Sequence, residues 1–133
     1  MRKAVINGSF DILHPGHLKL INVARFSAEH LLICIDSDRR IKELKGSTRP
    51  INNEYWRTAM LDAIKGVNEV VVFDSQEELE NILKYYQADV MVKGSDYKDK
   101  PIIGSEYCRE IVFVDRLDEY STSAKIQDIT SRG

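Results

Sequence analysis

Two histidines at the start of a predicted helix are the residues whose types and spacing most clearly indicate chemistry. His14 and His17 lie three positions apart, with Pro15 and Gly16 between them. Residues three apart share one face of a helix, so both imidazole rings can donate to one phosphate. The helix N-terminus adds backbone N–H groups and a positive dipole end, and Gly16 leaves the backbone open to a ligand. We therefore expect a phosphate site here.

A metal site is the other common use of such a histidine pair, but the sequence does not complete one. Zinc needs at least one or two further protein ligands. The remaining histidine, His30, falls at the far end of the predicted helix, and Cys34 and Cys108 match no metal-ligand spacing. We therefore predict no metal ion bound by protein side chains alone.

The elements that must position the histidines alternate along the chain. Apolar, β-branched runs predict strands at residues 3–6, 31–35, 69–73, 90–92 and 111–114. Helical patterns separate these strands, which indicates a Rossmann-like α/β fold with a doubly wound, parallel, five-stranded sheet and helices on both faces. The length of 133 residues fits one domain, residues 1–133.

For two of the predicted helices, the sequence indicates which residues form the apolar side. The first begins at Asn52 or Asn53 and ends at Gly66, and its inward side is predicted to hold Trp56, Met60, Leu61 and Ile64. The other is the last helix, capped by Ser121, with apolar points at Ala124, Ile126 and Ile129. Ser75 is predicted to open the helix between the third and fourth strands.

Ligands of an open parallel sheet bind beyond the carboxyl ends of its strands. The segments at those ends contribute Gly8, Ser9, Phe10, Asp11, Asp38, Lys42, Lys45, Lys93, Gly94, Asp96, Arg116, Ser121, Thr122 and Ser123. Glycines, hydroxyls and cations at one edge favour an anion as ligand, and phosphate is the obvious anion.

Composition and charge exclude several other classes. The formal net charge of −2 creates no positive field for nucleic acid, and no aromatic residues interleave the basic residues around 39–49. No apolar stretch approaches the roughly 18 residues of a membrane span, and no signal peptide opens the sequence. We therefore expect a cytoplasmic protein with neither nucleic-acid nor membrane partners.

Three motifs together resemble one family. Gly8, Ser9, Phe10 and Asp11 match a G-[ST]-F-D turn, residues 14–17 match H-x-G-H, and residues 121–123 match a closing serine/threonine motif. In this order the motifs resemble the cytidylyltransferase-like nucleotidyltransferases, over almost the whole chain. Residues 44–52 and 92–97 are similar to the bacterial heptose 1-phosphate adenylyltransferases, although Ser95 replaces a glycine. Glycerol-3-phosphate cytidylyltransferases are the next resemblance.

The resemblance implies that an acceptor phosphate oxygen attacks the α-phosphorus of a nucleoside triphosphate and releases pyrophosphate. Such a reaction needs positioning and charge neutralisation, and no enzyme nucleophile. We assign catalysis to His14, His17, Lys45 and Arg116. We assign nucleotide binding to Gly8, Ser9, Phe10, Asp11, Gly16, Lys93, Gly94, Asp96, Ser121, Thr122 and Ser123. We assign the acceptor to Asp38, Lys42, Arg57 and Tyr97. The resemblance implies that Arg57 reaches the acceptor phosphate.

The remaining expectations concern substrates and partners. Mg²⁺ should arrive with the nucleoside triphosphate, and Asp11 or Asp38 could assist it. ATP is favoured over CTP, with a sugar phosphate such as heptose 1-phosphate as acceptor. Two alternatives stay open: a polyol-phosphate cytidylyltransferase that uses CTP, and a non-catalytic nucleotide sensor. The resemblance also implies a homodimer.

Overall fold

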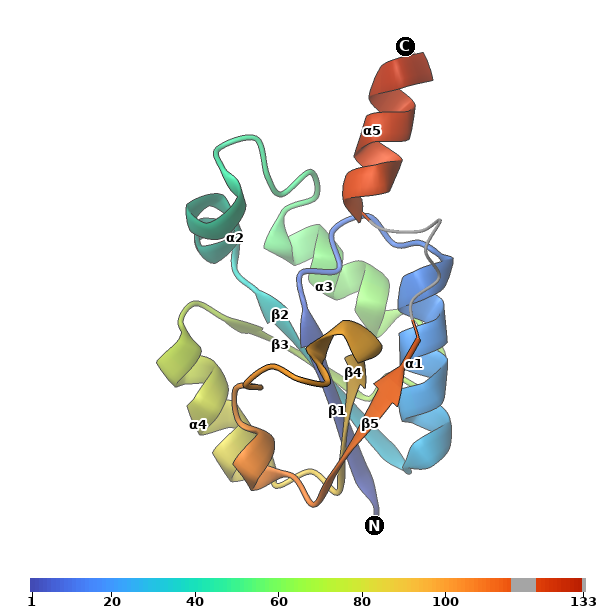
Figure 1. Ribbon diagram of the computed structural model, residues 1–133, viewed down its shortest axis with the longest axis vertical. Helices are drawn as coiled ribbons and strands as arrows, with labels where there is room; N and C mark the ends of the chain where they lie inside the picture. The colour runs from blue at the N-terminus through green and yellow to red at the C-terminus, as the bar shows by residue number, and fades with distance from the viewer. Residues whose placement is uncertain (116–121, 133) are drawn as a thin grey trace.

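The computed structural model describes residues 1–115 and 122–132 (Figure 1). Its strands are β1 (Lys3–Gly8), β2 (His30–Asp36), β3 (Glu69–Phe73), β4 (Val90–Gly94) and β5 (Glu110–Val114). All neighbouring pairs are parallel, in the order β3-β2-β1-β4-β5. This arrangement confirms the predicted Rossmann-like, doubly wound sheet, and the order reverses direction at β1 and β4.

Helices cover both faces of the sheet. They are α1 (Pro15–Ser27), α2 (Asp38–Lys45), α3 (Glu54–Asp62), α4 (Gln76–Tyr86) and α5 (Thr122–Arg132), with short 3₁₀ turns η1 (Ser95–Tyr97) and η2 (Ser105–Tyr107). In Figure 1, α1 and α4 lie on opposite sides of the sheet. Ile21 of α1 and Leu61 of α3 pack in one core cluster, and Leu79 and Leu83 of α4 pack in the other.

The strands are continuous apolar runs because both of their faces are buried. Val5 and Ile6 are neighbours in β1, are both 0% exposed, and belong to different core clusters. The side chains of a strand alternate between its two faces, so a central strand between two helical layers needs apolar residues at every position. The polar residues therefore appear where the strands end.

Short polar side chains set the starts of the helices. Ser37, Asn53 and Ser75 accept hydrogen bonds from the backbone N–H groups of Arg40, Trp56 and Glu78. These bonds satisfy donors that have no partner inside the helix. The predictions of a helix start at Asn53 and at Ser75 are confirmed.

The prediction for the inward side of α3 is partly wrong. Trp56 is 57% exposed and Met60 is 44% exposed, whereas Arg57 and Leu61 are buried. The helix also ends at Asp62, before Gly66, which lies in the following turn at φ 91°. On α5, Ile129 is 62% exposed, and the helix stands beyond the sheet edge in Figure 1. Among the described helices, none has the length and apolar character needed to cross a membrane.

Candidate active site

The histidine pair lies at the N-terminus of α1, immediately after the turn that follows β1. His14 is the N-cap, with extended backbone, and its Nδ1 accepts from the Gly16 N–H at 3.1 Å. His17 Nδ1 accepts from the His14 N–H at 3.2 Å. The rings stack with centroids 3.8 Å apart, which confirms that both rings share one face. The N–H of Gly16, expected to meet a phosphate, is used to orient His14 instead.

These hydrogen bonds from the backbone determine which ring nitrogen carries the proton in each neutral histidine. A ring that accepts at Nδ1 carries its proton on Nε2 when it is neutral. Burial, followed by the charges of His14 and Lys45, lowers the pKa of His17 to about 4. His17 is therefore a neutral Nε2–H donor at pH 7, and Lys45 is close enough to act on it electrostatically.

The turn between β1 and α1 is packed beneath the histidines. Phe10 is 3% exposed, adopts φ 49°, and places its ring 5.1 Å from the His17 ring. A Cβ on Gly8 would approach the Phe10 ring to 3.2 Å, so the glycine lets that ring fold back. The buried Phe10 ring therefore packs against His17, and its predicted contact with the nucleotide stays a prediction.

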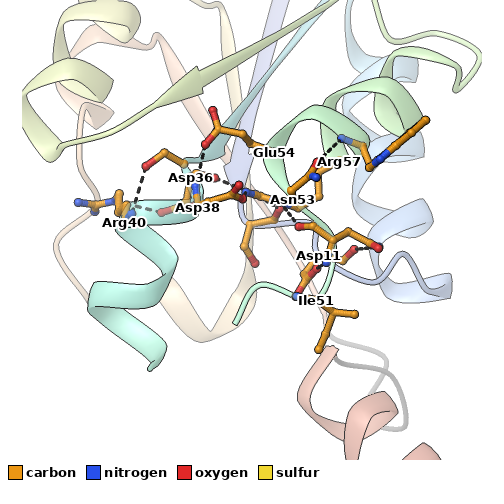
Figure 2. Close-up of polar contacts among 12 residues, drawn as sticks. Asp11, Asp36, Asp38, Arg40, Ile51, Asn53, Glu54 and Arg57 are labelled. Atoms are coloured by element: carbon orange, nitrogen blue, oxygen red, sulfur yellow. Dashed lines mark hydrogen bonds and ion pairs between the residues drawn. The ribbon is translucent and has the colours of Figure 1, made fainter. Parts of the chain in front are cut away.

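Asp11 ties this turn to the loop before α3. Its carboxylate accepts from the Ile51 N–H at 2.7 Å and from the Asn52 N–H at 2.8 Å (Figure 2). Asn52 Nδ2 donates to the Asp11 carbonyl at 3.0 Å. Both carboxylate oxygens of this buried residue are therefore committed to the backbone, which fits a positioning role and not a metal ligand.

Arg57 differs from its predicted role. Its side chain is fully buried, and Nε donates to the Asn52 carbonyl at 2.9 Å. Nη1 donates to the carbonyls of Ser9 and Asp36, at 3.0 and 2.7 Å, and Nη2 pairs with Asp38 Oδ1 at 2.7 Å (Figure 2). The guanidinium joins the ends of β1 and β2 to α3. The expected contact with an acceptor phosphate finds no support, because the side chain does not reach an open surface.

Asp38 is held in the same group of contacts. Its carboxylate pairs with Arg57, and its N–H donates to Glu54 Oε1 at 3.0 Å. Asp38 Oδ1 is therefore committed to Arg57, and the suggested assistance of Asp38 to Mg²⁺ stays a prediction. Across residues 1–115 and 122–132, no group of three or more histidine, cysteine, aspartate or glutamate side chains could hold a metal ion.

A cleft of about 280 Å³ lies at the carboxyl ends of the central strands. The predicted site residues that line it are Gly8, Ser9, Lys45, Lys93 and Tyr97. Lys42 is exposed on α2 and is not part of this lining. Of the three lysines predicted for the site, the cleft is thus lined by Lys45 and Lys93 but not by Lys42.

The β4 end of the cleft carries Lys93 and its neighbours. Lys93 Nζ lies 4.7 Å from the centroid of the Tyr97 ring. Burial lowers the pKa of Lys93, and the nearby Asp36 and Asp96 carboxylates oppose that shift. A Cβ on Gly94 would come within 2.7 Å of Asp96 Oδ1, so the glycine allows the carboxylate to turn back over the strand end.

The start of α5 approaches the same edge. Arg49 Nη2 donates to Ser123 Oγ at 3.3 Å, and within the described chain Arg49 Nε is buried without a hydrogen-bond partner. Thr122 begins the helix. The predicted site residues Arg116 and Ser121 lie outside the described residues.

Sequence reasoning missed several residues of this site. Arg49 and Asn7 were not assigned, although Asn7 lines the cleft and Arg49 contacts α5. Asp36 and Arg40 also line the cleft, where Arg40 Nε pairs with Asp36 Oδ2 at 3.0 Å. The position of Asn7 and Asp36 at strand ends was a usable signal; the reach of Arg49 depends on tertiary structure.

The strand order and the histidine pair at the carboxyl edge define a Rossmann-like α/β protein with its site near the topological switch point. Residues 5–128 match the model of the cytidylyltransferase-like family. The chain therefore belongs to the cytidylyltransferase-like family of nucleotidyltransferases, as the three sequence motifs predicted.

Relatives agree with this membership. The bifunctional protein HldE of Campylobacter fetus subsp. fetus is 42% identical over 123 residues, which are 92% of this chain and 27% of that protein. HldE of Helicobacter hepaticus is 43% identical over 123 residues, 92% of this chain and 25% of that protein. The chain thus spans about a quarter of the length of these relatives.

A solved structure shows the same fold. The lipopolysaccharide core biosynthesis protein from Thermoplasma volcanium GSS1 superposes with a TM-score of 0.73 at 21% identity, over 89% of this chain and 99% of that chain. At this level of identity the likeness concerns the architecture of the sheet and its helices.

Proposed function

We propose that the chain transfers a nucleoside monophosphate, with ATP as the favoured donor, to a sugar phosphate such as heptose 1-phosphate and releases pyrophosphate. The observation that carries the proposal is the stacked pair His14 and His17, both oriented by backbone N–H groups at a helix N-terminus. Such preorganised donors stabilise charge that develops on a phosphate oxygen in the transition state.

In the proposed reaction, the acceptor phosphate oxygen forms a bond to the α-phosphorus while the bond to the β-phosphate oxygen breaks. His17 donates Nε2–H to an α-phosphate oxygen, and Lys45 neutralises charge between the two substrates. Arg116, Ser121, Thr122 and Ser123 are proposed to hold the leaving pyrophosphate. We propose that Mg²⁺ enters bound to the triphosphate, since Asp11 and Asp38 are engaged with protein partners.

The acceptor and donor preferences rest on relatives. The HldE proteins of Campylobacter fetus subsp. fetus and Helicobacter hepaticus are 42% and 43% identical to the chain over the matched region. A panel that pairs ATP and CTP with heptose 1-phosphate and glycerol 3-phosphate, read by pyrophosphate release, tests the proposal. We expect release with ATP and heptose 1-phosphate. Release that requires CTP and glycerol 3-phosphate would favour the cytidylyltransferase alternative, and nucleotide binding without release would favour the sensor.

The proposal extends to setting and assembly. We infer a cytoplasmic enzyme, where ATP and sugar phosphates are available, and a homodimer. Exposed apolar side chains support self-association, namely Leu18 and Phe26 on α1 and Trp56 and Met60 on α3. Light scattering of the purified protein tests the dimer, and a monomer mass at micromolar concentration would contradict it.

A further inference from the structure

On the sheet face that α4 covers, three polar side chains follow the last apolar core residues of the central strands. On that face the last core residues of the central strands are Val5, Cys34 and Met91. Side chains alternate along a strand, so the next positions on the same face are Asn7, Asp36 and Lys93. All three line the cleft, directly beyond the apolar core. The β1–β4 register, in which Val5 pairs with Met91, brings Asn7 beside Lys93.

Among Asn7, Asp36 and Lys93, the positively charged residue is Lys93, and no carboxylate of the described residues forms an ion pair with it. Within the described part of the chain its ammonium makes no hydrogen bond and no ion pair, and it rests over the Tyr97 ring at 4.7 Å. Arg40, in contrast, is paired with Asp36 at 3.0 Å. A half-buried ammonium that contacts an aromatic ring but no oxygen is costly, and a ligand oxygen would lower that cost.

The rest of the cleft indicates what kind of ligand would supply that oxygen. An amide, a carboxylate and an ammonium side by side can bind several hydroxyl groups as both donors and acceptors. The lining also includes the apolar side chains of Phe73, Leu79, Ile102 and Ile103, which suit the C–H faces of a sugar. The volume of about 280 Å³ is at the lower limit of small-molecule pockets, so it favours a sugar over a whole nucleoside triphosphate.

Lys45 connects this cleft with the histidine pair. It lines the cleft, and its charge contributes to the lowered pKa of His17. A phosphate held at Lys45 would therefore lie between the cleft and the imidazole rings. The body of the same molecule would extend along β1 toward β4, where Asn7 and Lys93 end the two strands.

We propose that Lys93 is a specificity-determining residue for the acceptor, whose hydroxyl groups its ammonium binds in the cleft with Asn7 and Asp36. This inference rests on the proposed function. It moves Lys93 from the nucleotide, to which sequence reasoning assigned it, to the acceptor. A polyhydroxylated sugar phosphate reaches Lys93, whereas a three-carbon polyol phosphate bound at Lys45 is too short to make the same set of contacts.

Lys93→Met tests the assignment because it keeps an unbranched side chain of similar length and removes the ammonium that lies over the Tyr97 ring. We expect the KM for heptose 1-phosphate to rise about tenfold or more, and the KM for ATP to change less than about twofold. Calorimetric titration of heptose 1-phosphate into enzyme saturated with a non-hydrolysable ATP analogue should show the same loss of affinity. Lys84→Met, an exposed lysine on α4, is the matched control and should change neither constant.

Several outcomes would overturn the assignment. A raised KM for ATP with an unchanged KM for heptose 1-phosphate would return Lys93 to the nucleotide, and two unchanged constants would leave it without a role. If Lys93→Met does not fold, Asn7→Ala tests the same cleft from β1 with the same expected direction. Wild-type protein that binds heptose 1-phosphate but transfers no nucleotide would contradict the proposed function alone, and the titrations would still decide the role of Lys93.

Discussion

At the scale of single residues, the site depends on imidazole rings whose tautomers are set by backbone donors. His14 and His17 each accept at Nδ1, so no acidic side chain is needed to orient them. Burial keeps His17 neutral, and a neutral ring donates without the cost of desolvating a cation. In the proposed reaction, the negative charge of a bound triphosphate would raise the pKa of His17 and strengthen the donor where charge develops.

Replacing His17 should affect turnover far more than folding. We expect His17→Ala to lower kcat by about two orders of magnitude or more, the scale for losing one preorganised transition-state donor. Pyrophosphate release by purified, folded protein measures the change. His30→Ala is the control, because His30 lies at the opposite end of the sheet beside Tyr86. Near-normal turnover of His17→Ala would remove this histidine from the catalytic machinery.

The lowered pKa of His17 also predicts how stability depends on pH. The unfolded chain takes up a proton at this residue below about pH 6.5, whereas the folded chain does so only near pH 4. Protonation of His17 therefore favours the unfolded state as the pH falls from 6.5 to 4. Above that range His17 does not lower the free energy of unfolding. We expect the free energy of unfolding to lose roughly 2 kcal/mol at pH 5 relative to pH 7 through this group.

Urea unfolding of wild type and His17→Gln at both pH values isolates that contribution. The variant should lose less stability between pH 7 and pH 5 than wild type, since every other titrating group is shared. Equal losses in the two proteins would mean that His17 titrates normally in the folded state.

The residues with local signals were predictable, and those defined by tertiary contacts were not. The histidine pair is visible in the sequence because its spacing and its Pro15 and Gly16 neighbours describe a helix start. Arg57 is an arginine in an ordinary helical pattern, and only the folded chain shows that it is fully buried among backbone carbonyls. A charged residue in the core contradicts the usual link between charge and exposure, so composition could not identify it.

At the scale of elements, α3 shows how a correct helix can be given the wrong face. Trp56 and Met60 are four apart, and so are Arg57 and Leu61, so two adjacent stripes compete for the core. Hydrophobicity favours the first stripe, but the structure buries the second because Arg57 satisfies the strand-end carbonyls. The starts of the helices were predicted better, since a cap such as Ser75 acts within three residues.

Removing the guanidinium of Arg57 should detach α3 from the ends of β1 and β2. Arg57→Met leaves the carbonyls of Ser9, Asp36 and Asn52 and the Asp38 carboxylate without their donor. We expect a loss of about 3–5 kcal/mol in the free energy of unfolding, as for other buried charges that lose a partner. Arg39→Met is the control: its ion pairs with Glu43 and Asp74 are exposed, so the change should stay below about 1 kcal/mol.

Chemical denaturation of the two variants makes the comparison. A loss below about 1 kcal/mol in Arg57→Met would show that the buried arginine is not a structural tie.

At the scale of the whole molecule, the fold was predictable because each strand carries its own signal. Alternation of apolar runs with helical patterns is enough to specify a parallel sheet, and the right-handed rule for connections limits the strand orders. Hydrogen bonds between segments that are distant in sequence are not indicated by any comparable local pattern. Asp11 holds Ile51 and Asn52, and Arg49 holds Ser123, across 40 and 74 positions of sequence. These contacts connect the histidine turn, the loop before α3 and α5 into one site.

The chain should retain its fold without α5 but lose its activity. The buried residues of both core clusters extend no further along the described chain than Val114, and Ile129 of α5 is 62% exposed. Removal of residues 122–133 therefore takes little apolar surface from the described core, and we expect the Tm to fall by less than about 5 °C. Thr122 and Ser123, two of the proposed ligands of the leaving pyrophosphate, are lost, so pyrophosphate release should become undetectable and calorimetric affinity for ATP should fall at least tenfold. Full-length protein with Ile129→Ser is the matched control and should keep both properties. A truncated chain that unfolds far below wild type would show that α5 belongs to the core, and one that retains turnover would exclude the helix from the active site.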